Sequence, residues 1–379
     1  MIQIVLEFFA DGILSIGWQQ WVMYLTGCAL IWLAIAKDYE PMLLLPIGFG
    51  AILVNLPYEV VWHHEGVAGA LKVLFDAGIS TELFPLLVFV GVGAMCDFTP
   101  LFQRPWLMIF GAPAHLGVFV TTIIAVLMGF TLSEAASIGI IGAADGPTAI
   151  FVSMKLANHL LAPITVVAYS YMSLVPIIQP PVVRALTTKH ERLIRMEIQH
   201  QHKIPKVVTI TFPIIVTLLA SLLVPMAAPL IGFLMFGNLI RECGCLEKMS
   251  KTAQNEMSTI VTILLGISVG ASMRADAFLQ MATLKILALG LVAFVFDTAG
   301  GVLCAKFLNL FLKRKINPMI GACGISAFPM SSRVIQKMAF KDDPSNIVLM
   351  QAINANAAGQ VASVVVGGLV LALVPILLK

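Results

Sequence analysis

The stretch Gly142-Ala-Ala-Asp145-Gly146-Pro147-Thr-Ala-Ile-Phe151 interrupts a long apolar passage of this chain. Pro147 lacks a backbone donor and disfavours helix at the residue before it, and Gly142 and Gly146 loosen the chain further. The pattern predicts two half-helices joined by unwound backbone, which a membrane tolerates only where protein or a watery cavity covers it. Freed carbonyls and the Asp145 carboxylate would offer the oxygen ligands that sodium-coupled carriers use. The alternative is a kinked helix whose Asp145 pairs with an arginine or a lysine.

The overall composition is that of a polytopic membrane protein. Of the 379 residues, 59% are hydrophobic and 11% are charged, and the mean hydropathy is +0.96. A soluble domain carries about 25% charged residues. At about 20 residues per span, the apolar passages allow roughly ten or eleven spans or re-entrant elements. The net charge of +3 is too small to indicate a nucleic-acid partner.

The ends and cysteines of the chain indicate its compartment. The N-terminus has no basic region and no cleavage signal, so we expect it to be retained. Residues 2–16 carry Glu7 and Asp11 and are expected to form an interfacial helix. The six cysteines are scattered and no histidine cluster completes a metal site, so we expect no metal beyond Na⁺. A multispanning chain of this kind fits a bacterial-type inner membrane.

Charge and hydropathy divide the chain into three parts. The N-terminal repeat, residues 1–183, contains the broken element at residues 134–157. A short segment at residues 184–206 is dense in lysine and arginine, and the positive-inside rule places it in the cytoplasm. The C-terminal repeat, residues 207–379, contains a second broken element at residues 316–333.

Three short segments of the first half recur with similar sequence, and in the same order, in the second half. These recurrences, here called echoes, indicate that the two halves arose by duplication. Their offsets of 184, 177 and 179 residues are nearly equal, and they pair 45–50 with 229–234, 91–95 with 268–272, and 141–145 with 320–324. The link before the first broken element has no cation, whereas Lys313-Arg-Lys315 precedes the second. We therefore expect an all-α fold of two inverted repeats, whose broken or re-entrant elements enter from opposite sides and meet near the midplane.

The second broken element supplies neutral oxygens and one permanent cation. Gly321 loosens it, and Asn317 and Ser326 carry an amide and a hydroxyl. Such oxygens suit Na⁺. Arg333 is a poor cation ligand, but its planar fork binds a carboxylate in a bidentate manner. Asn356, in the following apolar helix, is equally compatible with ion binding and with helix packing.

These motifs resemble a known family, the membrane β subunit of the sodium-translocating biotin-dependent decarboxylases of the oxaloacetate, methylmalonyl-CoA, glutaconyl-CoA and malonate types. The resemblance covers essentially the whole chain. It rests on Gly142–Thr148, on Tyr171, and on Asn317, Gly321, Ser326 and Arg333 at spacings of four, five and seven residues.

The resemblance implies a mechanism and a set of roles. Members of the family release CO₂ from carboxybiotin held on a carrier subunit, consume a proton and export sodium. Tyr171, rather than Tyr169, and Arg333 would serve the proton and the carboxybiotin. Sodium binding would fall to Asp145, Asn317, Ser326 and Asn356. The implied partners are a carboxyltransferase subunit, which selects the acid, a biotin carrier subunit and a small membrane subunit, together with membrane lipid and further copies of this chain in a homo-oligomer.

Two other functions fit the residue pattern. A secondary transporter that couples Na⁺ to a small carboxylate would use the same inverted repeat and the same arginine. A structural anchor without chemistry is the third reading, and a carboxylate in a broken intramembrane helix argues against it. The residues alone leave the pump and the carrier open, and the family resemblance favours the pump.

Overall fold

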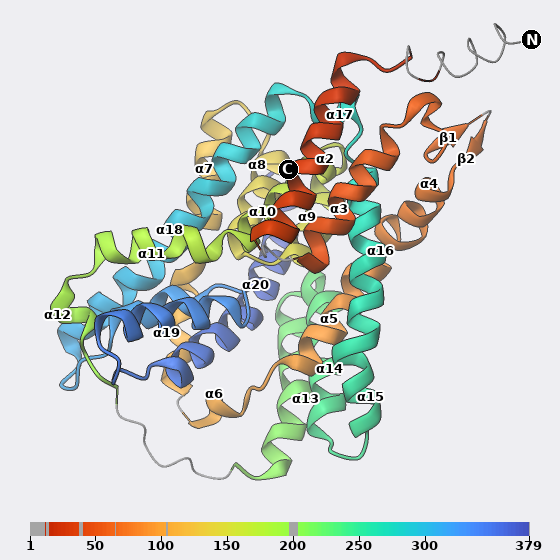
Figure 1. Ribbon diagram of the computed structural model, residues 1–379. Coiled ribbons are helices and arrows are strands. Elements are labelled where there is room, and N and C mark those ends of the chain that lie inside the picture. Colours follow the sequence, from red (N-terminus) through yellow and green to blue (C-terminus); the bar gives the residue numbers. More distant parts are fainter. Residues whose placement is uncertain are drawn as a thin grey trace, which may run out of the picture.

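The computed structural model describes Gly12 and residues 15–37, 41–64, 66–103, 105–196 and 204–378. The interfacial helix expected at residues 2–16 lies almost entirely outside this part of the chain, as do residues 197–203 of the basic linker. Most of the described residues are helical (Figure 1). They include a two-stranded antiparallel sheet of β1 (His63–His64) and β2 (Val67–Ala68). The protein is therefore an all-α membrane protein.

Five of the described helical segments are long and apolar enough to cross a membrane: α2 (Trp18–Lys37), the segment Pro105–Leu127, α13 (Lys206–Leu223), α18 (Met281–Phe311) and α20 (Leu349–Leu377). Two pairs of consecutive helices, each bent at a short break, raise the count to seven if each pair is taken as one span. The bends are 58° for Ala70–Ser80 with Leu83–Met95 and 66° for Asn158–Ser173 with Val175–Leu186. Shorter apolar helices accompany these spans, among them α3 (Pro41–Val54) and the segment Leu132–Ala143. The roughly ten or eleven elements expected from the sequence include spans and re-entrant elements together, and that total stays a prediction.

One group of helices joins the two halves of the chain through close crossings. The helix α3 packs against α16 (Ser258–Ala271), and α5 (Leu83–Met95) packs against α14 (Ala228–Glu242). A Cβ atom on Gly270 would lie 2.2 Å from the Ile47 carbonyl oxygen, and one on Gly93 would lie 1.8 Å from the Leu234 carbonyl oxygen. Glycine therefore permits both backbones to approach. On the outside, α2 packs on α3 and α13 packs on α14.

The second group contains both interrupted elements. The first element comprises α8 (Leu132–Gly139), η5 (Ile140–Ala143) and α9 (Gly146–Leu156). The second comprises η9 (Pro318–Gly324) and α19 (Met330–Asp342). Around them pack α7 (Leu116–Leu127), α10 (Leu161–Ser173), α11 (Val175–Leu186), α18 and α20. Figure 1 shows α11 running out from the centre of the molecule to α12 (Lys189–Arg192), which lies beside α19.

Short elements connect these helices. In the first half they are η1 (Pro57–Glu59), α4 (Ala70–Phe75), η2 (Asp76–Ser80), α6 (Thr99–Gln103), η3 (Pro105–Phe110), η4 (Pro113–His115) and η6 (Asn158–Leu160). In the second half they are η7 (Pro225–Ala227), α15 (Glu247–Thr252), η8 (Ala253–Met257) and α17 (Ala275–Phe278). Of these, η2 and η8 are π-helical turns, and η8 leads directly into α16.

Candidate functional site

The first interrupted element breaks at Ala144 and Asp145. Ala144 has φ 53°, in the left-handed region, and Asp145 has φ −135°, in the extended region. The next helix, α9, starts at Gly146 with Pro147 in its first turn. Proline suits this position, since the first turn of a helix needs no N–H donor there and the proline φ is already helical. The Gly-Pro pair therefore marks the start of the second half-helix.

The glycines of this element are sites of close packing. A Cβ atom on Gly142 would lie 2.5 Å from Oδ2 of Asp297 in α18. A Cβ atom on Gly146 would lie 2.2 Å from the ring of Tyr169 in α10. Neither glycine has a φ in the left-handed region, which in this element belongs to Ala144. The glycines therefore let α18 and α10 contact the unwound backbone. Gly321 plays the same part in the second element, where it touches the backbone of Gly301 in α18.

Asp145 is buried, and hydroxyl groups from two helices bond to its carboxylate. Oδ2 accepts hydrogen bonds from Thr148 at 2.7 Å and from Ser363 of α20 at 3.0 Å. The carboxylate stands at the N-terminus of α9, where the helix dipole favours negative charge. No arginine or lysine in the described ranges pairs with it. The arrangement is therefore an unpaired intramembrane carboxylate, and the alternative of a kinked helix with a paired Asp145 is not what the structure contains.

The second interrupted element presents its backbone to α20. Between η9 and α19, residues 325–329 are not helical. The Asn356 side chain donates to the Ile325 carbonyl oxygen at 2.6 Å, and the Gln360 amide donates to the Ser326 carbonyl oxygen. Asn356 also accepts a hydrogen bond from the Ser332 hydroxyl at 3.1 Å. Amides of α20 thus take up the carbonyl groups that the break releases, as buried backbone requires.

A cavity of about 540 Å³ lies where the two interrupted elements face α3, α5 and α16. Asp145 is the only charged side chain that lines it in the described part of the chain. The other polar groups on its walls are Tyr169, Gln254, Asn255, Ser258, Thr259, Thr262, Ser326 and Gln360. A carboxylate with neutral hydroxyl and amide oxygens is a ligand set for a hard monovalent cation.

The structure brings together only some of the residues expected at the site. Asp145 and Ser326 both line the cavity. Asn356 does not line the cavity, and its side chain bonds the Ile325 carbonyl oxygen and the Ser332 hydroxyl. Asn317, Tyr171 and Arg333 do not line the cavity.

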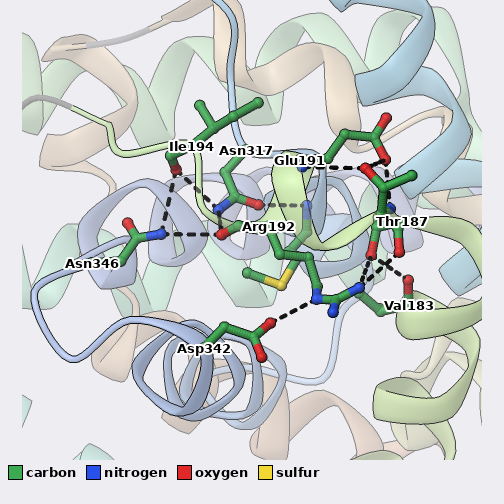
Figure 2. A network of polar contacts seen from close by, with 10 residues as sticks. Val183, Thr187, Glu191, Arg192, Ile194, Asn317, Asp342 and Asn346 are labelled. Carbon is green, nitrogen blue, oxygen red and sulfur yellow. Dashed lines mark hydrogen bonds and ion pairs between the residues drawn. The ribbon is translucent and has the colours of Figure 1, made fainter.

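Asn317 belongs to a polar network at the basic linker, which Figure 2 shows. Its side-chain amide donates to the carbonyl oxygens of Arg192 at 2.8 Å and Ile194 at 3.1 Å, and its own oxygen accepts from the Met319 N–H. The Arg192 guanidinium in turn bonds Asp342 of α19 at 2.6 Å. Asn317 therefore lies at the start of η9 and holds the linker against it. Both the nitrogen and the oxygen of its side-chain amide are hydrogen-bonded within the protein.

Tyr171 and Arg333 lie on other faces of their helices. The Tyr171 hydroxyl donates to the Leu287 carbonyl oxygen of α18 at 2.8 Å, and its ring packs on Phe294. Arg333 is exposed, and its side chain makes no hydrogen bond or ion pair within the described residues. It follows the cavity-lining Pro329 by four residues, so it lies one helical turn beyond the cavity along α19.

Several polar residues of the site escaped the sequence reasoning, and four of them belong to α9, α10 and α20. Thr148 and Ser363 bond Asp145, while Tyr169 and Gln360 line the cavity. A signal for two of them exists in the sequence. Asn356, Gln360 and Ser363 are spaced four and three residues apart, which puts one polar stripe on an apolar helix. Thr148 and Tyr169 carry no comparable signal, because their role depends on how separate helices meet.

Comparison with known proteins shows the family of the chain. Residues 19–374 match the family described as "Na+-transporting oxaloacetate decarboxylase beta subunit". The chain is 47% identical to methylmalonyl-CoA decarboxylase subunit beta of Propionigenium modestum over 98% of this chain and 100% of that protein. It is 47% identical to glutaconyl-CoA decarboxylase subunit beta of Acidaminococcus fermentans over 96% of each, and 44% identical to oxaloacetate decarboxylase beta chain 2 of Salmonella typhi over 95% and 96%. The chain therefore belongs to the family of membrane β subunits of sodium-transporting decarboxylases.

Proposed function

We propose that this chain is the subunit in which carboxybiotin, presented by a carrier subunit, loses CO₂ with consumption of a proton while Na⁺ is exported. The observation that carries the proposal is the cavity between the interrupted elements, whose only charged lining residue in the described chain is Asp145. A lone carboxylate in a largely apolar cavity attracts a cation strongly, because the low dielectric strengthens the Coulomb term. The family named above favours this pump over a carrier for small carboxylates.

Sodium binding is proposed for the carboxylate side of the cavity. Thr148 and Ser363 both donate to Oδ2 of Asp145, so neither of these hydrogen bonds occupies Oδ1. Ser326 and Gln360 offer a hydroxyl and an amide oxygen on the same cavity. We propose that Asp145 and Ser326 contact the ion directly. Asn356 supports Ser326 by holding the unwound backbone, and Asn317 supports η9 from the linker side.

Arg333 and Tyr171 are proposed to act on the carboxyl group and the proton. Arg333 has its five N–H donors uncommitted within the described residues, and it stands one turn beyond the cavity. That position suits a first contact for the carboxylate of an incoming carboxybiotin. Tyr171 holds its hydroxyl proton on the Leu287 carbonyl oxygen, at the contact between α10 and α18. We propose that this phenol supplies the proton that decarboxylation consumes.

We further propose that the two halves are inverted repeats. The support is reciprocal packing, since the helix of the first echo in each half packs on the helix of the second echo in the other half. These pairs are α3 with α16 and α14 with α5. Both interrupted elements then reach one cavity, which is the expected consequence of entry from opposite sides.

The proposed partners are a carboxyltransferase subunit, a biotin carrier subunit and a small membrane subunit, with this chain forming a homo-oligomer in a bacterial-type inner membrane. Exposed apolar side chains on α2 and α13, among them Trp21, Trp32, Leu218 and Leu222, suit contact with lipid or with another membrane chain. The linker carrying α12 supplies a basic cytoplasmic surface for the soluble partners.

The decisive test is avidin inhibition of sodium transport by the purified complex in proteoliposomes. We expect avidin to stop Na⁺ uptake and free biotin to prevent that inhibition, because only the pump requires a biotin group. Sodium transport that proceeds at the same rate with avidin present would show a simple carrier instead.

A further inference from the structure

Tyr169 occupies a special position in the cavity. It is 3% exposed, it lines the cavity beside Asp145, and its ring lies against Gly146 at the start of α9. Tyr171, two residues later on α10, points to a different neighbour and bonds α18. Of the two phenols on α10, Tyr169 is therefore the one that faces the cavity.

The Tyr169 hydroxyl makes no hydrogen bond within the described part of the chain. Buried tyrosines normally find a partner for this group. The other described phenols with well-defined partners illustrate this rule, since Tyr24 donates to the Asn55 carbonyl oxygen at 2.7 Å and Tyr171 donates to the Leu287 carbonyl oxygen at 2.8 Å. The partner of Tyr169 is therefore supplied by whatever occupies the cavity.

The charge of the cavity wall indicates the chemistry of that occupant. Among the residues that the structure describes, no arginine, lysine or histidine lines the cavity, so we expect an anion inside it to be held by bound sodium and by neutral donors. On the Asp145 side, Thr148 and Ser363 donate to the carboxylate, and Gln360 donates to the Ser326 carbonyl oxygen. The Ser326 hydroxyl is a proposed sodium ligand. The hydroxyls of Ser258, Thr259 and Thr262 lie on the α16 wall of the cavity, whereas the Tyr169 ring and hydroxyl lie against Gly146, next to Asp145. The Tyr169 hydroxyl is therefore the uncommitted donor on the Asp145 side, next to the proposed sodium site.

We propose that the Tyr169 hydroxyl donates a hydrogen bond to the carboxylate of carboxybiotin when that group enters the cavity beside the sodium site. The inference rests on the proposed function and names one of its substrate contacts. Tyr169 keeps its proton throughout and holds the carboxylate, whereas the proton consumed in the reaction comes from elsewhere. A hydrogen bond to a charged oxygen is among the stronger ones, so its removal has a measurable effect on the bound group.

The test is a single-turnover experiment on the intact complex with Tyr169→Phe. The carrier is loaded with a radiolabelled carboxyl group in the absence of sodium, sodium is added, and the loss of label from biotin is followed over a range of sodium concentrations. We expect the variant to lose label about tenfold more slowly than wild type at saturating sodium, with its half-saturating sodium concentration within about twofold of wild type. Phenylalanine keeps the ring on Gly146, and co-purification of the partner subunits checks assembly.

Tyr24→Phe is the matched control, because it removes a phenol hydroxyl that bonds a backbone carbonyl and does not line the cavity. It is expected to lose label at the wild-type rate. An unchanged rate in Tyr169→Phe would overturn the inference. So would a rise in half-saturating sodium that accounts for the whole defect, because Tyr169 would then be a sodium ligand. Failure of the proposed function looks different, since the wild-type complex would then retain its label when sodium is added.

Discussion

Ser363 donates a hydrogen bond of 3.0 Å to Oδ2 of Asp145, across a sequence separation of 218 residues. The last helix of the chain thereby closes on the break of the first interrupted element. The same helix reaches the second interrupted element through Asn356 and Gln360. The helix α20 therefore ties both breaks to one cavity, and the predictions below test the groups that meet there.

Asp145→Asn is expected to abolish sodium-dependent decarboxylation while the protein still inserts and assembles. The substitution keeps the size of the side chain but removes the only charge on the described cavity wall, and with it the main attraction for Na⁺. The measurement is decarboxylation rate against sodium concentration in the purified complex. Asp97→Asn is the control, since Asp97 pairs with Arg241 outside the cavity. Normal sodium activation in an assembled Asp145→Asn complex would refute the assignment.

Ser363→Ala is expected to raise the sodium concentration for half-maximal activity about tenfold. A hydrogen bond to a charged group contributes about 1.5–3 kcal/mol, and Ser363 is one of two hydroxyls that hold the Asp145 carboxylate in place. Ser268→Ala removes an equally buried hydroxyl, which bonds only the Leu264 carbonyl oxygen of its own helix, and should leave sodium activation unchanged. If both variants shift sodium activation alike, Ser363 contributes to packing and not to the site.

Arg333→Lys is expected to slow turnover of carboxybiotin severely although the charge is kept. Lysine lacks the planar fork that grips a carboxylate, and Arg333 has no partner within the described residues that would give it a structural task. The measurement is the decarboxylation rate at saturating sodium. Lys337→Arg, one turn further along α19 and also exposed, is the matched control. A wild-type rate in Arg333→Lys would remove Arg333 from the mechanism.

Tyr171→Phe is expected to reduce the decarboxylation rate strongly and to flatten its pH dependence, because the proposed proton donor is lost. The ring remains packed on Phe294, so the lost hydrogen bond to Leu287 should cost about 1 kcal/mol of stability. The measurement is a pH–rate profile at saturating sodium, with the thermal stability of the complex recorded beside it. A variant with the wild-type profile would show that the proton comes from another group.

Docking of the linker helix α12 is expected to weaken in acid. Partial burial raises the pKa of Glu191, but hydrogen bonds from Thr188 and the ion pair with Lys306 outweigh it and hold that pKa below its usual value. The stabilisation of docked α12 by the ionised Glu191 is therefore complete above the pKa of about 4.3 that this group has in an unfolded chain. It is lost as the pH falls through the lower pKa of Glu191 in the folded protein. Hydrogen exchange of residues 189–192 measures it. Glu191→Gln should reduce the pH dependence of this exchange and leave the part that comes from the Arg195–Asp343 ion pair, whereas Glu247→Gln, on an exposed pair, should not change it.

The sequence by itself determined the features that depend on local chemistry. Its hydropathy specified a helical membrane protein, and the Gly146-Pro147 pair marked the point where a half-helix begins, because proline restricts both itself and the residue before it. The family motifs identified Asp145 and Ser326, which do line one cavity. Apolar composition alone does not distinguish a membrane span from a short apolar helix such as α3, so it left the number of full spans open.

Only the tertiary structure decided which polar groups meet at the carboxylate. Tyr169 and Tyr171 are two residues apart on α10, and the rotation of that helix against α9 and α18 puts the first in the cavity and the second on a carbonyl. Asn317 shares an element with Ser326 but faces the linker, because η9 turns its start toward Arg192. Ser363 reaches Asp145 through the packing of α20 on α9. Such contacts depend on how separate helices are oriented and packed, and no local pattern in the sequence specifies that.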